Sequence, residues 1–159
     1  MSFQPSPVAD VDIDLVGVGW PASYSTAADI VIPIVGSGGR TRATINSNQI
    51  TLPAGSHYRL ELSYSVFGTS PAAQSARIEI QWYNYTDGVY FGQSAYGAGD
   101  AYDDSRTGRI CATALVLDSD ISTSLVVEAR IKACLATLRD GDIAEYSKNP
   151  TLRIMELPA

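Results

Sequence analysis

Apolar and polar side chains alternate along much of the chain. In the stretch ITLPAGSHYRLELSYSVFG, residues 50–68, the apolar positions of one parity are Tyr58, Leu60, Leu62, Tyr64 and Val66. Arginine, glutamate and serine occupy the other parity. Because successive side chains of a strand point to opposite faces, this pattern predicts one long strand with a single buried face. The preceding Pro-Ala-Gly supplies a tight turn that sets where the strand begins.

The same alternation recurs in shorter segments. They read VDIDLVGV, DIVIPIV, ATINSNQITL, ARIEIQWYN, GVYFGQS, GRICATALVL, TSLVVEARIKA and TLRIMEL. In the first of these, the apolar parity is Val11, Ile13 and Leu15, and we expect it to face the core. Tight turns are expected at Asn-Ser-Asn, within ATINSNQITL, and at Thr86-Asp87-Gly88. Pro33 predicts an edge or a bulge in DIVIPIV.

Helical spacing of apolar residues is nearly missing from the sequence. About nine or ten strands separated by turn residues predict an all-β fold, an antiparallel two-sheet jelly-roll sandwich. We expect one domain over residues 11–159, preceded by an arm over residues 1–10. Longer irregular connections are expected at 68–76 and 95–108, and in the tail that ends at Pro150.

Composition and charge narrow the possible partners. The chain has 159 residues with 45% hydrophobic side chains, enough for a packed core, and its net charge is −6. An acidic surface repels phosphate backbones, which argues against a nucleic-acid partner. No apolar run reaches the roughly 20 residues of a membrane span, and the N-terminus does not have the pattern of a secretory signal. Cys111 and Cys134 are expected to be reduced, partly buried thiols.

Candidate catalytic and metal-binding residues are few. His57 is the only histidine, and no GxSxG, HExxH or P-loop spacing occurs, so we predict that the chain is not an enzyme and has no organic cofactor. Asp100, Asp103 and Asp104 share one loop with two glycines. They are candidate oxygen ligands for Ca²⁺, and the alternative is a solvated acidic loop. Acids also alternate at Asp10, Asp12 and Asp14.

Several of these segments, in this order, resemble a jelly-roll module of bacteriophage virions and fibre tips. The resemblance rests on ITLPAGSHYRLELSYSVFG, ARIEIQWYNYTDG, YFGQSAYG and the terminal LRIMELP, and it covers Ile50 to Leu157. This module is similar to the trimeric folds of tumour necrosis factor and the complement globular heads. The resemblance implies a homotrimer in the virion, made in the host cytoplasm. It would serve as a capsid-decoration, head-fibre or tail knob protein, with loops available for host adhesion. Only about 50 residues precede the match, which favours a knob over a long tail fibre.

Aromatic residues provide the candidate contact surface. Trp82 falls on the parity expected to face the core. The contact candidates are Tyr83, Tyr85, Tyr90, Tyr96, Tyr102 and Arg106. Tyrosines among small polar residues are typical of adaptable recognition surfaces, and they also pack interfaces between subunits. The tyrosines could therefore form a subunit interface, or they could stack on a glycan of the host surface. For the protein as a whole, the alternative function is a carbohydrate-binding, lectin-like module.

The N-terminal stretch FQPSPVAD is expected to be extended because of its two prolines. In the arm hypothesis, Phe3, Pro5 and Pro7 lie along a neighbouring subunit or another capsid or tail protein. The alternative is a frayed end.

Overall fold

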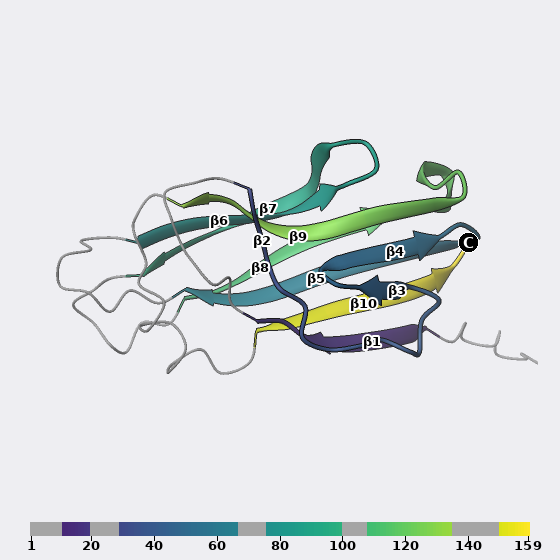
Figure 1. The fold of residues 1–159 in the computed structure, drawn as a ribbon, viewed down its shortest axis with the longest axis horizontal. Coiled ribbons are helices and arrows are strands. Elements are labelled where there is room, and N and C mark those ends of the chain that lie inside the picture. Colours follow the sequence, from purple (N-terminus) through teal and green to yellow (C-terminus); the bar gives the residue numbers. More distant parts are fainter. Residues whose placement is uncertain (1–10, 20–28, 67–75, 100–107, 135–149) are drawn as a thin grey trace, which may run out of the picture.

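Antiparallel strands make up nearly all the regular structure of the described residues (Figure 1). The computed structural model describes residues 11–19, 29–66, 76–99, 108–134 and 150–159. Its strands are β1 (Asp12–Gly17), β2 (Ile30–Val31), β3 (Thr44–Asn46), β4 (Gln49–Pro53), β5 (Ser56–Val66), β6 (Ala76–Asn84), β7 (Val89–Gly99), β8 (Gly108–Val116), β9 (Ser124–Cys134) and β10 (Thr151–Pro158). A 3-10 turn, η1 (Asp118–Asp120), joins β8 to β9. The all-β prediction is confirmed.

The ten strands of the described residues form one continuous sheet that divides into two layers, here called sheet 1 and sheet 2. Sheet 1 has the order β1-β10-β5-β8, and sheet 2 has the order β7-β6-β9-β4-β3 with β2 beside β9. A single residue pair between β7 and β8, Gln93 with Thr113, links them. Most neighbours within each sheet are far apart in sequence, as in a jelly roll, so the predicted fold class is confirmed.

Inward-facing residues of the two sheets form one core. In sheet 1 the register places Leu62 between Leu152 and Ala112, and all three are fully buried. In sheet 2, Trp82 is fully buried and its indole N–H donates to the Ala112 carbonyl oxygen at 3.2 Å. Thus the apolar face predicted for β5 and the inward position predicted for Trp82 are confirmed.

The first strand faces the opposite way from the prediction. In β1 the buried side chains are Asp14 and Val16, whereas Ile13 is 38% exposed and Leu15 is 64% exposed. Val18 continues the buried parity. Asp14 can be buried because nearby backbone amides donate to its carboxylate.

The seventh strand is longer than predicted. Residues 95–99, expected to begin a long connection, continue β7 and pair with β6 as far as Ala76. The pairing shifts register between Ile80 and Trp82, and the continued strand places Tyr96 opposite Glu79. A bulge thus allows a long strand where the glycine-rich sequence indicates a loop.

Gly92, on β7, packs directly against β8. Its φ is +70°, and a Cβ atom there would lie 2.6 Å from both the Ala114 Cβ and the Thr113 carbonyl oxygen. Gly88, at the β6–β7 turn, has a similar φ of +72°, but its nearest neighbour would be the Tyr83 hydroxyl at 3.7 Å. The two positions therefore share backbone strain and differ in available space.

Replacing Gly92 with alanine is expected to lower the free energy of unfolding by about 2–4 kcal/mol, because left-handed strain adds to overpacking. Gly88→Ala is the matched control and should cost about 1 kcal/mol, from strain alone. Urea unfolding measures both. Equal costs would show that β7 and β8 are not held this closely.

Candidate functional site

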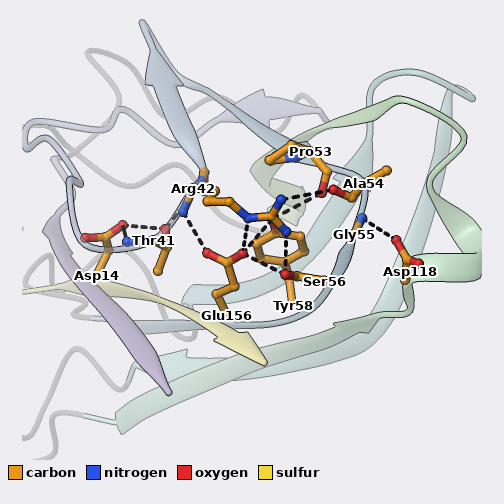
Figure 2. Close-up of polar contacts among 11 residues, drawn as sticks. Asp14, Thr41, Arg42, Pro53, Ala54, Gly55, Ser56, Tyr58, Asp118 and Glu156 are labelled. Atoms are coloured by element: carbon orange, nitrogen blue, oxygen red, sulfur yellow. Dashed lines mark hydrogen bonds and ion pairs between the residues drawn. The ribbon is translucent and has the colours of Figure 1, made fainter. Parts of the chain in front are cut away.

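A buried carboxylate organises one end of the sandwich (Figure 2). Glu156, on β10, points inward and accepts from the backbone N–H of Arg42 at 2.7 Å and from the Arg42 Nε at 2.5 Å. The Ser56 hydroxyl donates to it at 2.7 Å, and the Tyr58 hydroxyl lies 3.4 Å away. Arg42 also donates to the Ser56 hydroxyl and, at 3.3 Å, to the Ala54 carbonyl oxygen. Glu156 thus joins β10, the start of β5 and the segment before β3.

A second carboxylate holds the residues just before Arg42. The Asp14 oxygens accept from the backbone N–H groups of Gly39, Arg40 and Thr41 at 2.9, 2.8 and 3.1 Å. The Thr41 hydroxyl donates to Asp14 at 2.5 Å. Asp14 and Glu156 together bind four consecutive backbone amides, from Gly39 to Arg42. We call Asp14, Thr41, Arg42, Ser56 and Glu156 the carboxylate clasp.

The Pro-Ala-Gly corner is fixed from the side of η1. Asp118 accepts from the Gly55 amide at 2.5 Å, and the Asp118 amide donates to the Nδ1 atom of His57 at 2.9 Å. His57 is half-buried and acts as an acceptor here. This matches the interpretation of His57 as a hydrogen-bonded turn residue.

Hydrogen bonding outweighs burial at both clasp carboxylates. Burial opposes ionisation of Asp14, but the Thr41 hydroxyl and the amides of residues 39–41 lower the pKa of Asp14 below its usual 3.8. At Glu156, burial again opposes ionisation, and the donors of Arg42 and Ser56 lower the pKa below 4.5. Burial raises the pKa of Tyr58, with the Glu156 charge adding to the effect. The clasp therefore holds charged, fully paired carboxylates, a structural arrangement rather than an activated one.

Two of the predicted contact tyrosines lie together on the outer face of sheet 2. Tyr83 and Tyr90 are paired across β6 and β7, with ring centroids 5.1 Å apart in an edge-on arrangement. The Arg130 guanidinium lies 3.5 Å from the Tyr83 ring centroid, and the Lys132 ammonium lies 5.3 Å from that of Tyr90. The Tyr90 hydroxyl donates to Asp29. Burial, followed by this bond, raises the pKa of Tyr90.

The remaining contact candidates are placed differently. Tyr85 is 53% exposed at the β6–β7 turn, and Tyr96 is 73% exposed, opposite Glu79 on β7. Tyr102 and Arg106 lie outside the described residues, as do the candidate calcium ligands Asp100, Asp103 and Asp104 and the arm residues Phe3, Pro5 and Pro7. Within the described ranges no group of three or more histidine, cysteine, aspartate or glutamate side chains is placed to hold a metal ion. Among the contact candidates that the structure describes, the exposed aromatic rings are therefore those of Tyr85 and Tyr96.

The outer face of sheet 1 has a different character. Ile13, Met155, Arg59 and Leu115 form one row across its four strands, with Leu115 58% exposed. In the next row Glu61 lies between Arg153 and Thr113, and it pairs with Arg153 at 3.3 Å and with Arg59 at 2.7 Å. A hollow of about 500 Å³ beside Leu115 is lined in part by Arg59 and Leu157.

Cys111 lies on the same outer face, opposite Ser63. It forms no disulfide and is exposed, whereas we expected a partly buried thiol. Its outward direction follows from the parity of β8, in which the flanking Ile110 and Ala112 face the core. Desolvation by neighbouring groups, followed by the charge of the Glu61 carboxylate, raises the pKa of the Cys111 thiol. The side chain of Cys134 lies outside what the structure describes.

The clasp was not predicted from the sequence. Its central contact joins residues 114 positions apart, Arg42 and Glu156, and no local spacing indicates such a pair. One signal was available at Glu156, which shares the parity of the apolar Leu152 and Ile154 in TLRIMEL. An acid on the buried parity of a strand indicates a hydrogen-bonded partner from elsewhere in the chain.

Comparison with known proteins supports the fold. No protein-family model and no curated protein sequence matches the chain. Among solved structures, it is similar to murine APRIL determined at pH 8.5, 8.0 and 5.0, with TM-scores of 0.55, 0.54 and 0.55. The similarity covers 93% of this chain and 100% of each APRIL chain, at 7–8% sequence identity. The chain therefore has the tumour necrosis factor-like jelly-roll fold that the sequence predicts.

The described part of the chain contains no helix of the length and hydrophobicity required to traverse a lipid bilayer.

Glu156→Gln is expected to flatten the acid limb of the stability curve. Because folding lowers the pKa of Glu156, its stabilisation is present above pH 4.5 and is lost as the pH falls through the lower folded value. The variant should therefore be less stable than wild type at pH 7 and lose less stability between roughly pH 5 and 2. Urea unfolding across this range measures the slope. Met155→Gln, which places the same amide on the outer face of β10, should retain the wild-type slope. Equal slopes for all three chains would contradict the role given to Glu156.

Proposed function

We propose that the chain is a homotrimeric structural protein of a bacteriophage virion, a capsid-decoration, head-fibre or tail knob protein with loops that contact the host surface. In this proposal the sheets serve as a scaffold for the connections between strands, and the role needs no chemical step. The virion assignment is supported by the order of the motifs between Ile50 and Leu157.

The outer face of sheet 1 is the observation that carries the self-association. Exposed large hydrophobic residues lie on its two outer strands, Ile13 and Leu15 on β1 and Leu115 on β8, and the exposed Leu117 follows directly after β8. Between them, Glu61 forms ion pairs with Arg59 of β5 and Arg153 of β10. The centre of the face is therefore polar, and the Glu61 charge is paired within the same chain. Exposed apolar side chains on a face whose central charges are already paired support an interface between proteins at this face.

The outer face of sheet 2 makes a useful contrast. Lys132 donates to Glu79 at 3.1 Å and to Gln81 at 3.0 Å, and Glu128 accepts from Gln49 and Arg130, each at 2.8 Å. These side chains cover the sheet with paired charges and amides. This face is suited to solvent, and sheet 1 is the side proposed to face the other subunits.

Leu115→Asp is expected to reduce the mass in solution from about three times 17.0 kDa to 17.0 kDa. An aspartate at this exposed site leaves the core intact but places an unpaired charge inside the proposed interface. The measurement is light scattering after size exclusion at micromolar concentration. Val89→Asp, on a side chain that is 51% exposed at the β6–β7 turn, is the matched control and should remain trimeric. A wild-type monomer at all concentrations would overturn the trimer.

The virion role predicts that the chain co-sediments with phage particles purified from cells carrying its gene, as measured by mass spectrometry of gradient fractions. Binding to a glycan array would instead favour the lectin-like alternative, which rests on the exposed Tyr85 and Tyr96 rings. Tyr96→Ala should then abolish that binding. Absence from particles, together with glycan binding, would overturn the virion role.

A further inference from the structure

One side of β1 is an open strand edge at Ile13 and Leu15 and is paired with residues 33–35 farther along. β1 is the outermost strand of sheet 1 and pairs with β10 on one side only. On its other side the Gly17 carbonyl oxygen accepts from Val35 at 3.0 Å, and the Gly19 amide donates to Pro33 at 2.7 Å. Backbone groups of a strand alternate between its two edges. The N–H and C=O groups of Ile13 and Leu15 therefore point to the same edge as Gly17 and Gly19.

No backbone group in the described ranges hydrogen-bonds to Ile13 or Leu15 along this edge. The neighbouring segment, residues 37–40, is held by the Asp14 side chain instead. Between it and the strand lies a hollow of about 460 Å³, lined by Ile13, Leu15 and residues 37–40 together with Asp14. The site thus offers unpaired ladder groups beside two exposed apolar side chains, as required for addition of an extended strand.

The sequence ahead of β1 has the properties of a strand that can pair on one edge only. Pro5 and Pro7 are two residues apart, so in an extended chain their missing N–H groups fall on one edge. In the same extended conformation, Gln4, Ser6 and Val8 would direct their N–H groups to the opposite edge. Such a segment can add to a sheet by one side, while its proline side blocks any further strand.

The shortest hairpin that would pair this segment with its own β1 has Ala9 and Asp10 as its two-residue turn. Two-residue hairpin turns favour Asn-Gly, Asp-Gly or a leading glycine, because a central residue takes positive φ. Ala-Asp does not meet this requirement. Pairing with a second copy of the chain needs no turn. Six extended residues span about 20 Å, the length of an ordinary strand.

We infer that residues 3–8 of one copy add as an edge strand to the free side of β1 in a second copy. The partner is another molecule of this same chain, with Gln4, Ser6 and Val8 toward the β1 edge. Each copy gives one segment and receives one, so the exchange can close in a ring. The inference adds a defined contact to the proposed self-association and is independent of the virion role.

Hydrogen exchange at the Ile13 and Leu15 amides tests the inference on the full-length chain. In wild type, exchange at these two amides should slow by at least about tenfold between dilute and concentrated samples, because the ladder forms only between copies. Ser6→Pro removes a donor from the pairing edge and should abolish the slowing. Pro7→Ser is the matched control; it changes only the opposite edge and should retain the slowing.

Protection that does not change with concentration, or that persists in Ser6→Pro, would overturn the exchange of segments. Light scattering on the same samples separates this outcome from failure of the trimer. A mass near three times 17.0 kDa with unprotected amides would reject the strand exchange and leave the trimer standing. A monomer at every concentration would reject both.

Discussion

The carboxylate of Glu156 is the interaction on which the closed end of the sandwich depends. It accepts from the Arg42 backbone amide, the Arg42 guanidinium and the Ser56 hydroxyl. Arg42 lies before β3 and Ser56 begins β5, and these two segments are not paired with each other as strands. A buried charge is costly unless its oxygens are fully paired. The donors therefore have to arrive together, and this requirement fixes the corner before β5 relative to β10.

The same logic extends to the segment from Gly39 to Arg42. It leads toward β3 without belonging to a strand, so its amides need partners other than a neighbouring strand. Asp14 and Glu156, on the adjacent strands β1 and β10, supply those acceptors with their side chains. As a consequence this part of the segment is bound by the Asp14 side chain rather than by the backbone of β1. The arrangement closes the sandwich, yet within the described ranges it gives the ladder groups of Ile13 and Leu15 no backbone partner on this edge.

The sequence predicts the parts of this fold that alternation alone determines. For β5 only one parity is consistently apolar, so its buried face follows directly. For β1 both parities carry apolar residues, Ile13 and Leu15 on one and Val16 and Val18 on the other. The choice depends on donors to Asp14 that lie 25–27 residues away, and alternation contains no information about them. Arg42 and Glu156 illustrate the same limit for the candidate site.

The reversal of β1 has a consequence for assembly. Had its apolar parity faced inward, sheet 1 would present Asp12 and Asp14 outward and repel a partner of the same net charge. Instead Ile13 and Leu15 add apolar surface to the face that already carries Leu115 and Leu117. An exposed apolar face and an open strand edge thus coincide at β1. Exposing an apolar face or an unpaired strand edge to solvent costs free energy. One contact between copies can bury the apolar face and pair the edge at the same time. The burial of Asp14 makes this possible, because it turns Ile13 and Leu15 outward.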